Sequence, residues 1–294
     1  MEATAAPSTV SDIRRTARRG LAIYFAIVVV LSAAIEGFLI ANPQLNGLIA
    51  LLMFVPTVAS VAARLILKEG FADVSFRFGG RRGLGAVGIA SVFPVAVGLV
   101  AYGTAWVSGL AGFGGLPSAS FIVPFAVGMV VGLFLAAGEE LGWRGYMLTR
   151  LIDAGVPRPV FASGLIWALW HVPLVLGGVY AAGPSPVLSA GLIVVSITLF
   201  GYVIARLRLG TGSVWPAVVL HAAWNRVIQQ LFDPATTGAG ATLWVGESGV
   251  LTALTLVLAA FIFSRGSWTI LREPPRREKA SVRREDAQAQ PTTR

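Results

Sequence analysis

The sequence predicts an all-α, polytopic membrane protein with about eight transmembrane helices and a polar cavity within the membrane. The chain of 294 residues is 55% hydrophobic and 13% charged, with a mean hydropathy of +0.76. It is therefore too apolar for a soluble domain and too long for a single span. Apolar runs of spanning length recur along it. The few strongly polar side chains inside these runs, which are costly in hydrocarbon, predict the cavity.

The first predicted helix, 20–41, follows a polar and then basic segment at 1–19. Its apolar run is longer than the core of a signal peptide, so we expect it to remain as a membrane span. Length and apolarity predict further spans, which short polar or Gly/Pro turns separate. These spans are 45–67, 84–109, 121–146, 160–179, 187–207, 214–232 and 249–264. The predicted organisation is one membrane domain at 20–264 and a disordered basic tail at 265–294.

Basic residues lie on alternate connections between these spans. If the N-terminus is cytoplasmic, every Lys and Arg outside the spans falls on the cytoplasmic side, and the opposite connections contain none. We therefore expect a cell-membrane protein with both termini in the cytoplasm. The net charge of the chain is +9, and its basic residues would then face the anionic lipids of the cytoplasmic leaflet. We therefore expect no nucleic-acid partner. The absence of cysteine excludes disulfides and cysteine nucleophiles. The excess of Arg over Lys, with abundant Ala, Gly and Val, suggests a prokaryotic source.

Two adjacent carboxylates, Glu139 and Glu140, interrupt the apolar run that begins at Phe121. On a helix, Glu140 shares a face with Arg144 four residues later, so we expect a structural ion pair that orients the neighbouring site. Glu139 points about 100° away from that face and has no partner in its own helix. It needs a partner from another helix.

Both histidines of the chain lie in apolar segments. His171 stands four residues after Trp167, and His221 stands four residues before Asn225, which puts the last two on one helix face. In the expected orientation, Glu139 and both histidines lie at similar depth in the cytoplasmic half of the bilayer. A glutamate, two histidines and an asparagine from three helices are the inventory of a hydrolytic site.

These residues resemble the three motifs of the CAAX-protease and bacteriocin-processing (CPBP, or Abi) family of intramembrane proteases. The matching elements are Glu139-Glu140-x-x-x-Arg144, Trp167-x-x-x-His171 and His221-x-x-x-Asn225. The family more often has Phe where this chain has Trp167. The resemblance covers roughly 121–232, and three motifs in the right order on consecutive spans are fairly specific. It implies a glutamate-dependent endopeptidase that needs no metal.

The residues and the resemblance predict the same chemistry, which is hydrolysis of a peptide bond by activated water. Glu139 and His171 would activate the water, and His221 and Asn225 would donate hydrogen bonds to the oxyanion. A second version places Zn²⁺ on Glu139, His171 and His221 with an open fourth position. We favour the version without metal because the chain has no H-E-x-x-H element and resembles a glutamate protease.

A different class of function stays open at this point. A non-catalytic transporter or an immunity-type scaffold could use the same polar cluster to bind a proton or a ligand. For a protease, the expected substrate is a membrane-associated protein or peptide, and the sequence does not say whether it is prenylated. The tryptophans are expected to serve in packing and as interface anchors rather than in the site. They include Trp143, Trp167, Trp170, Trp215 and Trp224.

Overall fold

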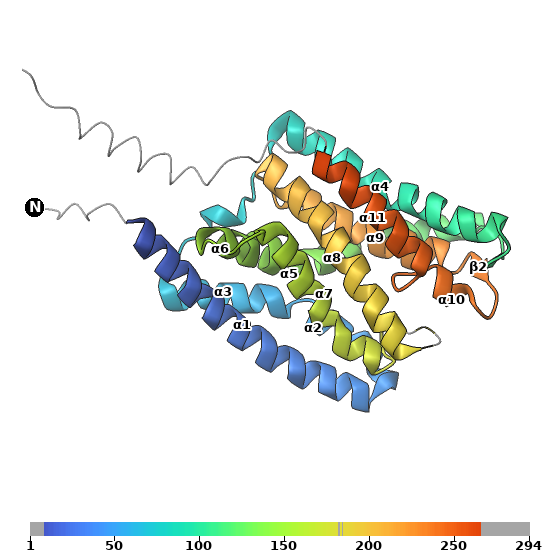
Figure 1. Ribbon diagram of the computed structural model, residues 1–294, viewed down its shortest axis with the longest axis horizontal. Helices are drawn as coiled ribbons and strands as arrows, with labels where there is room; N and C mark the ends of the chain where they lie inside the picture. Colours follow the sequence, from blue (N-terminus) through green and yellow to red (C-terminus); the bar gives the residue numbers. More distant parts are fainter. Residues whose placement is uncertain (1–8, 182, 184, 266–294) are drawn as a thin grey trace, which may run out of the picture.

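The computed structural model describes residues 9–181, 183 and 185–265 (Figure 1). The helices are α1 (Val10–Ala41), α2 (Ile49–Leu52), α3 (Val55–Leu67), α4 (Gly80–Val107), α5 (Ile122–Gly142), α6 (Leu148–Asp153), α7 (Pro159–Leu176), α8 (Pro186–Thr211), α9 (Trp215–Val227), α10 (Ala241–Trp244) and α11 (Val250–Arg265). Shorter elements are η1 (Pro43–Leu48), η2 (Ala72–Val74), η3 (Ala119–Phe121), the π-helical η4 (Trp143–Met147) and η5 (Ile228–Phe232), and strands β1 (Gly112–Phe113) and β2 (Thr236–Thr237). The predicted tail, apart from residue 265, lies outside the described residues, as do positions 1–8 of the predicted N-terminal segment.

The predicted fold class, an all-α multi-pass membrane protein, is confirmed. In the described part of the chain, 6 helical segments are long and apolar enough to cross a membrane. They are Val10–Ala41, Ile49–Leu67, Gly80–Val107, Ala119–Asp153, Pro159–Leu176 and Pro186–Thr211. The expected number of eight is not confirmed. The predicted span at 214–232 carries too many polar side chains to count by hydropathy, and α11 is shorter than these six.

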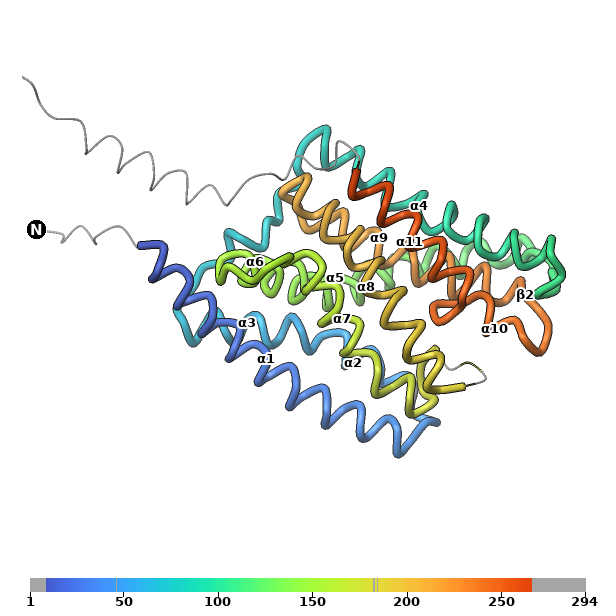
Figure 2. The backbone as a smooth tube through the Cα atoms, in the orientation of Figure 1, coloured from blue at the N-terminus to red at the C-terminus, as the bar shows by residue number. Residues whose placement is uncertain are grey.

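The helices form a bundle in which α1 and α3 lie along one edge and α4 and α11 along the other (Figure 2). Between the two edges, α5 packs against α3 and α9, and α7 packs along α8. The described chain starts and finishes at one end of the bundle, and α10 with the β1–β2 ribbon lies at the opposite end (Figure 1). This ribbon pairs Gly112 with Thr237 and so joins the connections that follow α4 and η5. Side chains from α5, α7, α8 and α9 can therefore meet in the interior.

Two helices differ from the predicted boundaries for identifiable reasons. Helix α1 begins at Val10, because a capping box of Thr9 and Asp12 satisfies the first backbone N–H groups. The predicted span at 45–67 is broken into η1, α2 and α3. The break falls just before Pro56, which lies in the first turn of α3, where its missing N–H costs no helical hydrogen bond.

Candidate active site

The paired glutamates end α5, at a place where the helix approaches α3 very closely. A Cβ atom added to Gly142 would lie 2.3 Å from the backbone of Pro56, so only glycine fits there. Gly138, one turn earlier, faces the Phe54 ring in the same way, and its carbonyl accepts a hydrogen bond from the Thr57 hydroxyl at 2.6 Å. The π-helical turn η4 follows directly, a distortion that is frequent at functional sites.

Glu140 is fully buried, and an arginine and a histidine contact its carboxylate. Its Oε1 lies 2.9 Å from Nη1 of Arg144, which is the ion pair expected from their spacing. The same oxygen lies 2.9 Å from Nδ1 of His221 on α9. The sequence predicts the first contact but not the second, because the sequence gives no distance between α5 and α9. Glu140 therefore links the first motif to the third.

Arg144 is also fully buried, and it is wedged between α7 and α8. Its guanidinium lies over the Trp167 ring, 4.2 Å from the ring centroid, which is a cation–π contact. On the other side, a Cβ added to Gly201 of α8 would lie 2.9 Å from Nη2 of Arg144. The absent side chain at Gly201 thus leaves the space that the guanidinium fills. Arg144 connects the first motif to the second by packing as well as by charge.

Glu139 has different partners from its neighbour. Its Oε2 accepts hydrogen bonds from the indole N–H groups of Trp167, at 2.8 Å, and Trp143, at 3.3 Å. In the described part of the chain its Oε1 has no hydrogen-bond partner. Unlike Oε2 of Glu140, this oxygen is not one of the buried polar atoms closed off from solvent. One oxygen of Glu139 is therefore fixed by neutral donors while the other is left available.

His171 is oriented by the backbone of its own helix. Its Nδ1 lies 2.8 Å from the carbonyl oxygen of Trp167. A carbonyl oxygen can only accept, so Nδ1 must carry the proton, and in the neutral ring the lone pair is on Nε2. The ring packs against the edges of Trp167 and Trp170 and beside Tyr180. The imidazole thus has a defined tautomer and a defined direction.

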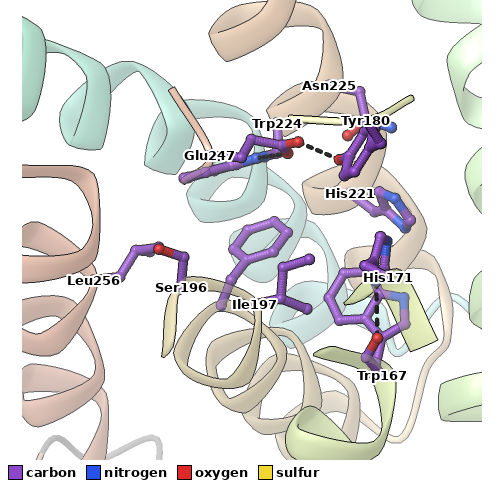
Figure 3. Close-up of a pocket in the computed structure, with 11 residues that line it drawn as sticks. Trp167, His171, Tyr180, Ser196, Ile197, His221, Trp224, Asn225, Glu247 and Leu256 are labelled. Carbon is purple, nitrogen blue, oxygen red and sulfur yellow. Dashed lines mark hydrogen bonds between the residues drawn. The ribbon is translucent and has the colours of Figure 1, made fainter. Parts of the chain in front are cut away.

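Residues of the second and third motifs line one pocket in the bundle (Figure 3). Its lining comes from α7, α8, α9, α11 and two connections: Trp167, His171, Tyr180, Ser196, Ile197, Phe200, His221, Trp224, Asn225, Glu247 and Leu256. The sequence predicts that Glu139 belongs to the hydrolytic site, yet it is not among the residues that line the pocket. It reaches the pocket wall through its hydrogen bond to the Trp167 indole. The rings of Trp167 and His221 are 5.2 Å apart, so the three motifs do converge.

Within the described residues, no group of three or more His, Cys, Asp and Glu side chains is arranged to hold a metal ion. The residues of the zinc alternative have other contacts. Nδ1 of His221 is bonded to Glu140, and Nδ1 of His171 is bonded to a backbone carbonyl. A metal would have to bind the Nε2 atoms and the free oxygen of Glu139.

The comparison with known families covers the same part of the chain. Residues 120–227 match the model of the type II CAAX prenyl endopeptidase Rce1-like family. This confirms the resemblance to the CAAX proteases. The matched segment contains all three motifs, from Glu139 to Asn225, and it supports an endopeptidase function at the level of the Rce1-like family. No curated protein matches the chain.

Sequence reasoning missed two groups of residues at the candidate site. The tryptophans are expected to serve in packing, whereas Trp143 and Trp167 donate hydrogen bonds to Glu139. The spacing of Trp143, four residues after Glu139, could have indicated its contact. Tyr180 and Glu247 also line the pocket, although they lie in connections and outside every motif. No local sequence signal marks either of them.

Proposed function

We propose that this protein is an intramembrane endopeptidase that hydrolyses a peptide bond of a membrane-associated protein or peptide, with water activated by Glu139 and His171. One observation carries the proposal. Each of these side chains has one polar atom fixed by the protein, Oε2 of Glu139 and Nδ1 of His171, and one acceptor atom left for a water molecule. Such a pair of fixed acceptors is suited to general-base catalysis. The match to the Rce1-like family supports the reaction class.

In the proposed reaction, Glu139 takes a proton from water while the water oxygen attacks the carbonyl carbon of the scissile bond. His171 accepts the second hydrogen bond of the water and so fixes its direction. The carbonyl oxygen becomes an oxyanion, and Glu139 then passes its proton to the departing amine nitrogen. The carbon–nitrogen bond breaks, and the products are a carboxylic acid, which keeps the second proton of the water, and an amine. No covalent enzyme intermediate is required.

Asn225 and His221 are the proposed donors to the oxyanion. The amide of Asn225 lines the pocket and has no hydrogen-bond partner among the described residues, so its N–H groups are available. His221 uses Nδ1 to bind Glu140, so only Nε2 can face the substrate. Nε2 is a donor only in the doubly protonated ring, which the Glu140 carboxylate stabilises. Removal of one such donor typically lowers kcat by about 10²–10³-fold.

The deciding experiment compares cells that carry the wild-type protein with cells that carry Glu139→Ala. Terminal-peptide mass spectrometry of the two proteomes should find new N- and C-termini, from membrane-associated proteins, in the wild-type cells alone. His171→Ala should remove the same termini. Because the two residues act as one unit, the double variant should be no worse than either single variant. Indistinguishable termini under all growth conditions would favour a transporter or scaffold instead.

The role of metal is tested on the purified protein. Without metal in the mechanism, we expect activity to survive exhaustive chelation and zinc to be present at well below one ion per chain. One zinc per chain, with activity lost on chelation and restored by Zn²⁺, would contradict the proposed mechanism and favour zinc on Glu139, His171 and His221.

A further inference from the structure

The pocket contains one carboxylate that the proposed reaction does not use. Glu247 lies in the connection between α10 and α11, beyond the segment that matches the Rce1-like family. It lines the same pocket as His171, His221 and Asn225 (Figure 3). A carboxylate at this position therefore shares the space in which a substrate segment beside the two histidines would lie.

Two neutral groups hold Glu247. Its Oε2 accepts a hydrogen bond from the Tyr180 hydroxyl, and its Oε1 accepts one from the Trp224 indole at 2.6 Å. Among the described residues, no arginine or lysine forms an ion pair with Glu247. Each carboxylate oxygen can accept two hydrogen bonds, so both keep an unused acceptor position. The contacts fix the carboxylate in place without neutralising its charge.

The connection that carries Glu247 is itself tied to the bundle. The backbone N–H of Gly246 donates to the Tyr102 hydroxyl at 3.0 Å, and that hydroxyl donates to Asp233. The second donor to Glu247, Trp224, directly precedes Asn225 on α9. The first donor, Tyr180, packs beside the His171 ring, with centroids 5.6 Å apart. Glu247 is thus held in a fixed relation to both sides of the candidate site.

Glu247 carries the unpaired charge of the pocket, because the positive charge proposed for His221 is already paired with Glu140. Of the pocket's described lining residues, Glu247 is the one carboxylate, and none is an arginine or a lysine. Tyr180 responds to this environment: burial raises the pKa of its phenol well above the usual value, and the negative charges of Glu247, Glu139 and Asp233 raise it further. An anion entering the pocket would meet like charge, and a cation would meet an unpaired carboxylate.

We infer that Glu247 is a specificity-determining residue that binds a lysine or arginine side chain of the substrate beside the scissile bond. The pocket correspondingly rejects a substrate that presents a carboxylate at that position. This inference rests on the proposed endopeptidase function. It predicts that the preferred cleavage site is a basic position within an apolar segment, rather than a site whose free C-terminal carboxylate must enter this pocket.

The test measures cleavage of synthetic peptides with the full-length protein in lipid nanodiscs. The peptides share one apolar Leu/Ala sequence, and a single position at a time holds Lys, Leu or Glu. For wild-type protein we expect one position near the cleaved bond at which kcat/KM falls in the order Lys, Leu, Glu, by about 10-fold per step, as for about 1.4 kcal/mol. Glu247→Gln keeps the size of the side chain, and its amide can accept from the Trp224 indole while donating to the Tyr180 hydroxyl. This variant should bring kcat/KM for the Lys and Leu peptides to within about 2-fold of each other.

Two control variants separate charge recognition from support of the fold. Tyr180→Phe removes a hydrogen bond to Glu247 but keeps the charge, so the order of the three peptides should persist. Glu247→Asp keeps the charge on a shorter side chain and should retain the preference for Lys, and it serves if Glu247→Gln does not fold. A uniform loss for all three peptides in Glu247→Gln, or a wild-type protein that cleaves them without regard to charge, overturns the inference alone. A wild-type protein that cleaves neither these peptides nor any cellular protein overturns the proposed function.

Discussion

Two regions of the bundle hold their carboxylates in opposite ways. Where the connection between α3 and α4 meets η4 and α6, arginines bind the carboxylates. Arg64 and Arg150 contact Asp73 at 2.6 and 2.8 Å, and Arg144 contacts Glu140 at 2.9 Å. These contacts pair charge with charge: those of Asp73 join α3 to α6 through η2, and that of Glu140 joins the end of α5 to η4. Carboxylates in this region serve mainly to hold helices together.

Around the pocket, the carboxylates accept hydrogen bonds from indoles and phenols instead. The donors are Trp143 and Trp167 for Glu139, Tyr102 for Asp233, and Tyr180 and Trp224 for Glu247. No ion pair to these three carboxylates is found in the described part of the chain. Neutral donors fix the position of a carboxylate while its charge, or its ability to take a proton, is kept. The boundary between the two regions runs between the adjacent residues Glu139 and Glu140.

The largest effect should come from Glu139→Gln. The amide keeps the shape of the side chain but cannot take a proton from water, so kcat should fall by about 10²–10⁴-fold. Stability should change little, because Oε1 of the amide can still accept from the Trp167 indole. Steady-state kinetics on a substrate recovered from the proteome comparison, together with thermal unfolding, would measure both. A Glu139→Gln protein with wild-type kcat would show that another residue takes the proton from water.

The neighbouring substitution, Glu140→Gln, should lower stability, and it should also lower kcat in part, because the Glu140 carboxylate stabilises the protonated His221 ring. It leaves the fully buried Arg144 without its carboxylate, and breaking a buried pair costs about 3–5 kcal/mol. The matched control is the double variant Glu140→Gln with Arg144→Met, which removes both charges and should recover much of the loss. Denaturant unfolding in detergent micelles would measure the free energies. If Glu140→Gln is stable but inactive while Glu139→Gln is active, the proposed roles are exchanged.

Asp233 should make the protein less stable as the pH rises. Burial, with a smaller contribution from the charge of Glu247, raises the pKa of this carboxyl from 3.8 to about 6, although the Tyr102 hydrogen bond lowers it. A raised pKa in the folded state means that folding favours the protonated form. Its stabilising contribution is therefore complete below about pH 4 and is lost as the pH rises through about 6, by up to about 3 kcal/mol. Unfolding free energies at pH 4 and pH 7 should show this loss in wild type but not in Asp233→Asn.

Asp73 should show the opposite and smaller dependence on pH. Burial alone would raise its pKa, but the hydrogen bond from Arg64 and the charges of Arg150 and Arg64 lower it below 3.8. Its contribution is present above pH 3.8 and is lost as the pH falls through the lower folded-state value. At neutral pH, Asp73→Asn should cost about 1 kcal/mol, because solvent reaches this partly exposed pair. Equal acid sensitivity of wild type and variant would argue against the arginine contacts.

Spacing along one helix could be predicted from the sequence, and contacts between helices largely could not. The Glu140–Arg144 pair follows from four-residue spacing, and the three motifs could be expected to meet because the family resemblance places them in one site. The contact between His221 and Glu140 depends on how α5 and α9 pack against each other, which spacing along the chain does not determine. Glu247 lies in a turn with no motif, and only the fold brings it to Tyr180 and Trp224. Pro56 is a sequence signal for the break before it, but Pro94 and Pro173 lie inside the continuous helices α4 and α7, so a proline alone does not predict where a span is interrupted.

The π-helical turn η4 also constrains how the length of this segment can change. Five residues, Trp143–Met147, take up a wider turn between the glutamates and α6. A π-helical turn holds one residue more than an α-helical turn, so deletion of one residue here would restore an ordinary α-helix and keep α6 close to its present register. The same deletion within α6, before Arg150, would rotate everything after it by about 100°. Arg150 would then leave Asp73, although no residue of the first motif need be altered. For chimaeras and domain exchanges, the register between Glu139 and Arg150 is therefore a unit to be moved whole, and a junction belongs before Gly138 or after Asp153.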